Sequence, residues 1–235
     1  MAITKAVILA AGRGTRMQGL TEAVPKPMLP IRGRPMLAHL VDNLRRAGLR
    51  DILIVTGYRA EQIEGYFASQ TGIVFRHQQV RDGTARAALL ARDFAGADAF
   101  LLTYGDILVA PEAYQGLIAG MEGCEAVLAV KHVEDPRQGA AVYVEGDRVT
   151  RIIEKPPRGA STTHYNSAGF YGFRLSIFGH FAAAPLSPRG EYEITDAIRL
   201  LIATGAPVGI YAIPGWWRDV GRPDDLAKAE RELDR

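Results

Sequence analysis

Residues 5–17 read KAVILAAGRGTRM, a short apolar run followed at once by a glycine-rich segment. The run Lys5–Leu9 has the length and the β-branched content of a buried strand. Small residues directly after such a strand let backbone N–H groups approach phosphate oxygens, and Arg13 and Arg16 add positive charge. The segment predicts a phosphate-binding loop at the carboxyl end of the first strand, with a plain flexible turn as the alternative.

Two other glycine-rich phosphate loops do not fit this segment. A dinucleotide-binding turn needs a third glycine where Met17 stands and an acidic residue where the second strand ends. That strand ends instead in Thr56-Gly57-Tyr58. A Walker A loop ends in Gly-Lys-Ser or Gly-Lys-Thr, and the segment has no such ending.

Apolar, β-branched runs alternate with helical patterns through the first half of the chain. Strands are expected at 5–9, 51–56, 72–76, 99–104 and 125–131, and helices at 35–47, 60–67 and 84–94. Such alternation predicts an α/β fold with a doubly wound, mostly parallel mixed sheet of Rossmann-like type and helices on both faces.

The pattern changes from about Gly139 onward. A hairpin is expected at 140–144 and 148–153, with further strands at 169–174 and 208–213 and helices at 195–204 and 223–233. The second half is therefore expected to extend the same sheet as a mixed α+β region, so that residues 1–235 form a single domain.

Composition excludes several classes of protein. Of the 235 residues, 48% are hydrophobic and 23% charged, and the formal net charge of +2 does not suggest nucleic-acid binding. No window approaches the roughly 20 apolar residues of a membrane span, and the N-terminus does not resemble a signal peptide. The single cysteine, Cys124, excludes an internal disulfide and fits the cytoplasm. No histidine pair has the spacing of a helical metal site.

A second segment strengthens the interpretation of the glycine loop. Residues 25–31 read PKPMLPI, in which three prolines stiffen the chain around Lys26. LAAGRGTRM followed by PKPMLPI resembles the signature of the nucleotide-sugar pyrophosphorylases, which include glucose-1-phosphate thymidylyltransferases and the uridylyltransferase half of the N-acetylglucosamine-1-phosphate enzyme. The resemblance implies that the NTP phosphates are held by Ala11, Gly12, Gly14, Thr15, Arg16 and Lys26.

The stretch 78–85, QQVRDGTA, lies between a short expected strand and an alanine-rich helix. The Gln78 amide carries a donor and an acceptor and so can pair with the edge of a pyrimidine. Gly83 allows close backbone approach, and Thr84 is expected to cap the helix. A helix cap with polar neighbours is the alternative, but the stretch resembles the family's uracil- or thymine-binding segment, which implies nucleotide binding by these three residues.

A carboxylate follows the expected strand 99–104. Because the carboxyl ends of parallel strands face the ligand crevice, Asp106 is expected there, and beside a triphosphate its natural partner is Mg²⁺. Residues 217–223 resemble the family's W-x-D-x-G-x-P segment, which implies that Asp219 is the second metal ligand. The aspartate at this position is similar to that of the thymidylyltransferases. The N-acetylglucosamine-1-phosphate enzymes resemble one another in having asparagine there.

The sugar-phosphate side is expected in the second half of the chain. Glu154 and Lys155 match the family's E-K-P, which implies contacts to sugar hydroxyls and to the sugar phosphate. Gly139 resembles the glycine that borders the sugar, and Asn166 resembles the sugar ligand of the N-S-G segment, although Ala168 is an extra residue here. Residues 190–196, GEYEITD, match a further family stretch, to which we assign no catalytic role.

The resemblance implies a sugar-1-phosphate nucleotidyltransferase. It would join an NTP, UTP or dTTP, to a sugar 1-phosphate with Mg²⁺, using Arg16, Lys26 and Lys155 as catalytic residues. Residues 1–135 would bind the nucleotide and residues 136–235 the sugar phosphate, with no C-terminal β-helix domain, as a monomer or small homo-oligomer. A cytidylyltransferase acting on a phospho-alcohol and a non-catalytic nucleotide-binding paralogue remain as alternatives.

Overall fold

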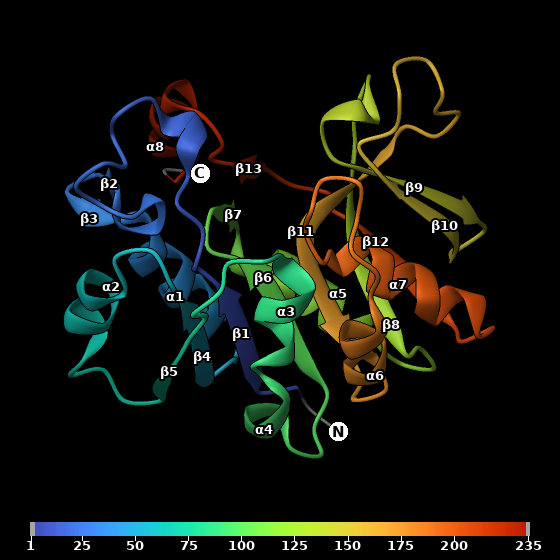
Figure 1. The fold of residues 1–235 in the computed structure, drawn as a ribbon, viewed down its shortest axis with the longest axis horizontal. Helices are drawn as coiled ribbons and strands as arrows, with labels where there is room; N and C mark the ends of the chain where they lie inside the picture. The colour runs from blue at the N-terminus through green and yellow to red at the C-terminus, as the bar shows by residue number, and fades with distance from the viewer. Residues whose placement is uncertain (1–2, 234–235) are drawn as a thin grey trace.

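The computed structural model describes residues 3–233, and a nine-stranded sheet runs through them (Figure 1). Its strand order is β5-β4-β1-β6-β11-β8-β12-β10-β9. The strands are β1 Lys5–Leu9, β4 Asp51–Thr56, β5 Ile73–His77, β6 Phe100–Tyr104, β8 Ala126–His132, β9 Ala140–Glu145, β10 Arg148–Glu154, β11 Tyr165–Phe173 and β12 Val208–Ala212.

Helices cover both faces of the sheet. They are α1 Met36–Arg46, α2 Ala60–Phe67, α3 Thr84–Leu89, α4 Arg92–Ala95, α5 Pro111–Ala119, α6 Ile177–Ala183, α7 Ile194–Ala203 and α8 Pro223–Glu232. Alternate residues of β1 point into two separate cores, because side chains of a strand alternate between faces. Ala6 and Ile8 pack with α1, α2 and α5, whereas Val7 and Leu9 pack with α3, α4, α6 and α7.

The strand order favours a ligand crevice at the carboxyl end of β1. Strands β5, β4, β1 and β6 are parallel, and β1 lies between β4 and β6. The chain leaves β1 towards β4 through α1 on one face, and it enters β6 after α3 and α4 on the other. Connections that diverge in this way leave a ligand crevice at the carboxyl ends of the strands.

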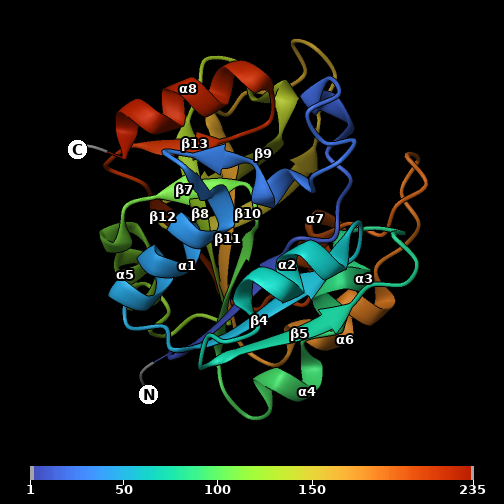
Figure 2. The same ribbon diagram turned by 90° about the vertical axis from the view of Figure 1, so that its left-hand side faces the viewer.

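The second half of the sheet contains both parallel and antiparallel pairs, and β11 makes an additional pairing with β9. Strand β11 runs antiparallel to both β6 and β8, and its residue Asn166 also pairs with Ala141 of β9. Two short strands lie outside the large sheet, β7 Ile107–Val109 and β13 Trp217–Asp219, which pair antiparallel. Figure 2 shows α8 and β13 above β7, close to the small pair β2 Pro30–Ile31 and β3 Arg34–Pro35.

The sequence predicted most of the strands and misplaced some helices. The helix expected at 84–94 is two helices, because the backbone N–H groups of Leu90 and Ala91 bond three residues back instead of four. Pro35 caps α1 from outside instead of lying in its first turn. Strands β7 and β13 and helices α5 and α6 have no counterpart among the predicted elements. None of the described helices is both long and apolar enough to span a membrane.

Candidate active site

The glycine loop stands over the carboxyl end of β1. Gly14 has φ of 71°, and a Cβ at this position would lie 2.8 Å from the Cβ of Lys26. Both the backbone conformation and the lysine stem therefore require glycine here. No atom lies within 4 Å of where a Cβ of Gly12 would stand, and Thr15 and Arg16 are exposed. The loop thus presents its backbone and Arg16 to solvent above the strand, open to a ligand.

Lys26 is held beneath this loop. It begins a 3₁₀ turn, Lys26–Met28, and it is buried with 7% of its surface exposed. Its Nζ donates to Asp106 Oδ2 at 2.5 Å, so the buried charge is paired. The ion pair joins the segment after the glycine loop to the turn between β6 and β7.

Asp106 and Asp219 lie on neighbouring segments. Asp219 pairs with Ile107 across the β7–β13 ladder, and the N–H of Val220 donates to the backbone oxygen of Asp106 at 3.0 Å. Burial, followed by the charge of Asp106, raises the pKa of Asp219 to about 6, against the opposing charges of Lys26 and Arg16. Two carboxylates that repel each other in a partly buried site form a favourable place for a further cation.

The donor set fits a divalent ion that brings other ligands with it. Residues 3–233 contain no cluster of three or more His, Cys, Asp or Glu able to hold a metal. Mg²⁺ commonly binds through one or two protein carboxylates, with phosphate oxygens and waters completing its shell. Asp106 and Asp219 match that arrangement, whereas a closed structural metal site would need more protein ligands.

The expected base-binding stretch is tightly packed. Gln78 is buried, and its Nε2 donates to the backbone oxygen of Gly83 at 3.1 Å and to Asp82 Oδ1 at 3.4 Å. Gly83 is the N-cap of α3, with φ of 132°. The expectation that Thr84 caps this helix is wrong, because its Oγ1 accepts from the N–H of Ile194 at 3.0 Å. Thr84 instead fastens α3 to the first residue of α7.

The residues expected at the sugar phosphate meet where β10, β11 and the turn before β9 come together. A Cβ on Gly139 would lie 2.8 Å from the side-chain amide of Asn166, and the oxygen of Gly139 accepts from the N–H of Lys155 at 2.9 Å. The Oδ1 of Asn166 is buried without a hydrogen-bond partner among the described residues, as expected of an acceptor reserved for a ligand. Lys155 is exposed with φ of 43°, a strained conformation for a residue with a side chain.

Sequence reasoning missed Arg189, which belongs to the same group. Its guanidinium binds Glu193 through Nε at 2.9 Å and Nη2 at 2.5 Å, and it approaches Glu154 at 3.5 Å. Burial, then the charge of Glu193, raises the pKa of Glu154, whereas Arg189 and Lys155 lower it. The position of Arg189 directly before the matched stretch 190–196 was the signal that pointed towards it.

Tyr104 interacts with one residue of the expected base segment and one of the expected sugar segment. It ends β6, two residues before Asp106, and burial raises the pKa of its phenol well above the usual range. The charge of Glu154 acts in the same direction, and Thr84 acts against it as a hydrogen-bond partner. Tyr104, two residues from Asp106, therefore interacts with Thr84 of the expected base segment and with Glu154 of the expected sugar segment.

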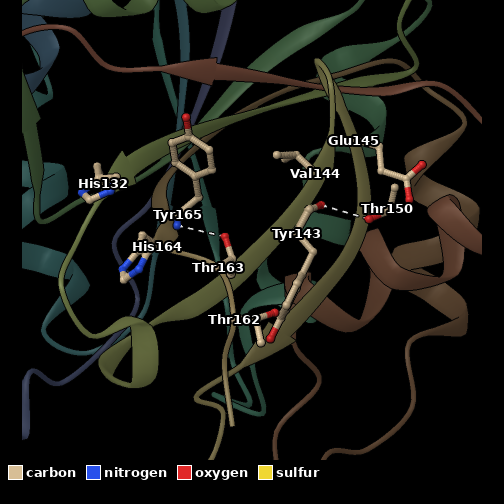
Figure 3. A pocket seen from close by; sticks show the side chains of 9 residues that line it. All are labelled: His132, Tyr143, Val144, Glu145, Thr150, Thr162, Thr163, His164 and Tyr165. Atoms are coloured by element: carbon tan, nitrogen blue, oxygen red, sulfur yellow. Dashed lines mark hydrogen bonds between the residues drawn. The ribbon is translucent and has the colours of Figure 1, made fainter. Parts of the chain in front are cut away.

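A separate hollow of about 540 Å³ lies beyond the sugar side (Figure 3). Tyr165 lines it, next to the imidazoles of His132 and His164, which stack with their centroids 5.3 Å apart. Neighbouring residues of a strand point to opposite faces, so Asn166 turns away from this hollow towards Gly139. None of the predicted site residues lines it.

Residues 5–235 match the family model described as nucleotidyl transferase. The chain belongs to this family. The resemblance carried by the glycine loop and the PKPMLPI segment is confirmed, as is the α/β fold class. Among curated relatives, the UTP–glucose-1-phosphate uridylyltransferase AglF of Haloferax volcanii is 35% identical, and the match covers 97% of this chain and 96% of that protein.

Other nucleotidyl transferase relatives are longer. The bifunctional protein GlmU of Methanocaldococcus jannaschii is 36% identical over 97% of this chain, and the chain spans about half, 54%, of that relative. Among solved structures, a putative glucose-1-phosphate thymidylyltransferase from Bacillus anthracis, in complex with a sucrose, superposes with a TM-score of 0.84. It is 27% identical and covers 97% of this chain and 94% of its own. A UDP-glucose pyrophosphorylase complexed with UDP-glucose has the same fold, with a TM-score of 0.87 at 22% identity over 99% of this chain and 98% of its own.

Proposed function

We propose that this nucleotidyl transferase joins an NTP, UTP or dTTP, to a sugar 1-phosphate and releases pyrophosphate. The observation that carries the proposal is the Lys26–Asp106 ion pair beside Asp219, directly below the open glycine loop. This arrangement, with two cations, Lys26 and Arg16, and two carboxylates, supports the binding of a metal-bound triphosphate. Relatives named as acting on UTP and glucose 1-phosphate support the substrate class.

The chemistry needs no activated nucleophile. An oxygen of the sugar phosphate is already anionic at neutral pH, and it attacks the α-phosphorus as the bond to the β-phosphate oxygen breaks. Catalysis then consists of positioning the two phosphates and stabilising charge. Arg16 would neutralise the departing pyrophosphate, Lys26 would hold an α-phosphate or sugar-phosphate oxygen, and Lys155 would orient the attacking phosphate.

Mg²⁺ is the proposed cofactor, with Asp106 and Asp219 as its protein ligands. When bound, the ion would offset negative charge on the phosphates. The raised pKa of Asp219 supports this assignment, because the site without a cation leaves a second carboxylate poorly compensated. Lys26 compensates Asp106 through their ion pair.

The two halves of the domain divide the substrates. Residues 1–135 would hold the nucleotide, with Gln78, Gly83 and Thr84 at the base and Ala11, Gly12, Gly14 and Thr15 at the phosphates. Residues 136–235 would hold the sugar phosphate, with Gly139, Glu154 and Asn166 at the sugar. Arg189 joins this second group because its guanidinium contacts Glu154. The cytoplasm is the proposed location, since a chain with one cysteine gains nothing from an oxidising compartment.

A turnover screen tests the proposal. Pyrophosphate release is measured with Mg²⁺ for four NTPs, each combined with several sugar 1-phosphates and several phospho-alcohols. We expect turnover with a sugar 1-phosphate and a pyrimidine triphosphate. Turnover restricted to CTP with a phospho-alcohol would reassign the chain as a cytidylyltransferase, and NTP binding with no turnover in any combination would identify a non-catalytic paralogue.

A further inference from the structure

Residues 57–62, which form the corner after β4 and the first turn of α2, contact the beginning of the glycine loop. The N–H of Tyr58 donates to the backbone oxygen of Ala11 at 3.0 Å. A Cβ on Gly57 would lie 2.8 Å from both the Cβ and the oxygen of Ala11, so the two backbones touch. The ring of Tyr58 also lies beneath Arg13, with the guanidinium carbon 5.6 Å from the ring centroid.

The same corner binds the end of the loop through three side chains. The backbone oxygen of Glu22 accepts from the Tyr58 hydroxyl at 2.9 Å and from Arg59 Nε and Nη2 at 3.0 and 2.7 Å. The next carbonyl, that of Ala23, accepts from Gln62 Nε2 at 2.8 Å. Four donors thus converge on two consecutive carbonyls, an arrangement that fixes the position of a backbone segment.

The donors themselves are held in place. Arg59 has φ of 51°, a left-handed conformation that is unfavourable for a residue with a side chain. Its guanidinium carbon lies 5.5 Å from the ring centroid of Tyr58, and its Nε also donates to the Tyr58 hydroxyl at 3.2 Å. Arg59 and Tyr58 therefore form one rigid unit facing Glu22.

The loop between these two attachments is largely exposed, although Thr21 Oγ1 donates to the backbone oxygen of Gly14 at 3.1 Å. Most of residues 12–20 are exposed, with Met17 as the buried exception. Directly after the second attachment come Val24 and Pro25 and then Lys26, so a shift at residues 22–23 passes through a stiff segment to the lysine. The placement of both Arg16 and Lys26 depends on where the loop is fastened.

We propose that Tyr58, Arg59 and Gln62 are positioning residues of the reaction, which hold the glycine loop and Lys26 in place to receive the NTP phosphates. The name carbonyl clamp is used here for these three residues. The inference rests on the proposed function, since it assigns the clamp to the triphosphate. Loss of the clamp should weaken NTP binding and leave sugar-phosphate binding unchanged. Loss of a merely structural contact should weaken both.

The experiment uses two variants. Arg59→Lys keeps the positive charge and loses the guanidinium that donates twice to the Glu22 oxygen. Tyr58→Phe loses the hydroxyl and keeps the ring beneath Arg13. Arg45→Lys is the matched control, because Arg45 also donates to a backbone oxygen, that of Thr71 at 2.9 Å, away from the crevice. We expect both clamp variants to raise KM for the NTP by about tenfold, which is ~1.4 kcal/mol. KM for the sugar phosphate should stay within about twofold of wild type, a change smaller than ~0.5 kcal/mol.

A second measurement is independent of catalysis. Arg13 and Arg16 are exposed in the loop, so trypsin cleavage after them, followed by mass spectrometry of the N-terminal peptides, reports how well the loop is held. Cleavage should accelerate in both clamp variants and remain unchanged in Arg45→Lys. If wild type shows no turnover, the proposed function fails, while faster cleavage and weaker NTP binding in the clamp variants would still support the clamp.

Two results would overturn the clamp. One is a set of variants whose cleavage rate and NTP affinity both match wild type. The other is an equal loss of NTP and sugar-phosphate affinity accompanied by a lower Tm, which would indicate general destabilisation instead of positioning.

Discussion

Lys26 Nζ donates to Asp106 Oδ2 at 2.5 Å across 80 residues of sequence. The contact joins the proline-rich segment after the glycine loop to the turn that follows β6, and Asp219 faces the same pair from β13. A buried lysine and two carboxylates at the ends of separate strands form a site in which each charge depends on the others.

Removing either member of the pair should abolish most activity without unfolding the protein. We expect Lys26→Ala or Asp106→Ala to lower kcat/KM by at least ~100-fold, the scale of losing one charged transition-state contact. Lys5→Ala is the matched control, because Lys5 forms its own ion pair with Asp98 at 2.8 Å at the opposite end of β1. Rates within about threefold of wild type in the site variants would reject their catalytic assignment.

The stability of the protein should fall as pH rises through the pKa of Asp219. Its pKa of about 6 in the folded protein lies above the usual aspartate value of 3.8, so folding favours the protonated form. The resulting stabilisation is fully present at low pH and is lost between the two values as pH rises. We expect Asp219→Asn to remove this part of the pH dependence of Tm, and an unchanged profile in the variant would contradict the assignment.

Mg²⁺ binding should restore the stability that is lost when Asp219 deprotonates. An ion that binds the folded protein through deprotonated carboxylates stabilises it by mass action. Millimolar Mg²⁺ is therefore expected to raise Tm more at about pH 7.5 than at about pH 5, where Asp219 is largely protonated. Thermal unfolding with and without chelator measures the difference, and a shift that persists in Asp106→Ala combined with Asp219→Ala would place the ion elsewhere.

Local sequence was sufficient for most strands of the large sheet and for some of the helices. Lys5–Leu9, Asp51–Thr56 and Ala60–Phe67 have the predicted bounds, because burial and hydrophobic periodicity act over a few residues. The ion pair between Lys26 and Asp106 was not predicted, because the two residues are 80 positions apart.

Local sequence could not predict contacts between residues that lie far apart in the chain. Thr84 was expected to cap its own helix, but its partner Ile194 is 110 residues away. Arg189 reaches Glu154 across 35 residues, and no periodicity relates the two. Strands β7 and β13 have three residues each, too short to produce a pattern, and they exist because they pair with each other.

Arg189 and Glu193 should shift the titration of Glu154 in opposite directions. The charge of Arg189 lowers the pKa of Glu154 and that of Glu193 raises it. If ionised Glu154 binds the sugar, Arg189→Gln should move the acid limb of kcat/KM for the sugar phosphate to higher pH, and Glu193→Gln should move it to lower pH. Arg199→Gln, which breaks the Arg199–Asp196 pair on α7, is the control. Shifts of the same sign in both variants would contradict this electrostatic role.

Gly83 should tolerate no side chain, because it is the point where the base segment meets residues 190–195. A Cβ there would lie 2.2 Å from the backbone oxygen of Tyr192, and φ is 132°. The backbone of Tyr192 cannot rotate away from the new Cβ as a flexible side chain could, so Gly83→Ala must separate the two segments. The separation should weaken two hydrogen bonds, from Tyr192 N–H to the Asp82 oxygen and from Ile194 N–H to Thr84 Oγ1. Gly123→Ala is the control, since Gly123 has φ of 68° with open space around it and should cost only ~1 kcal/mol. Denaturant unfolding and KM for the NTP measure both variants, and an effect of Gly83→Ala no larger than that of the control would show that the two segments are not coupled through this contact.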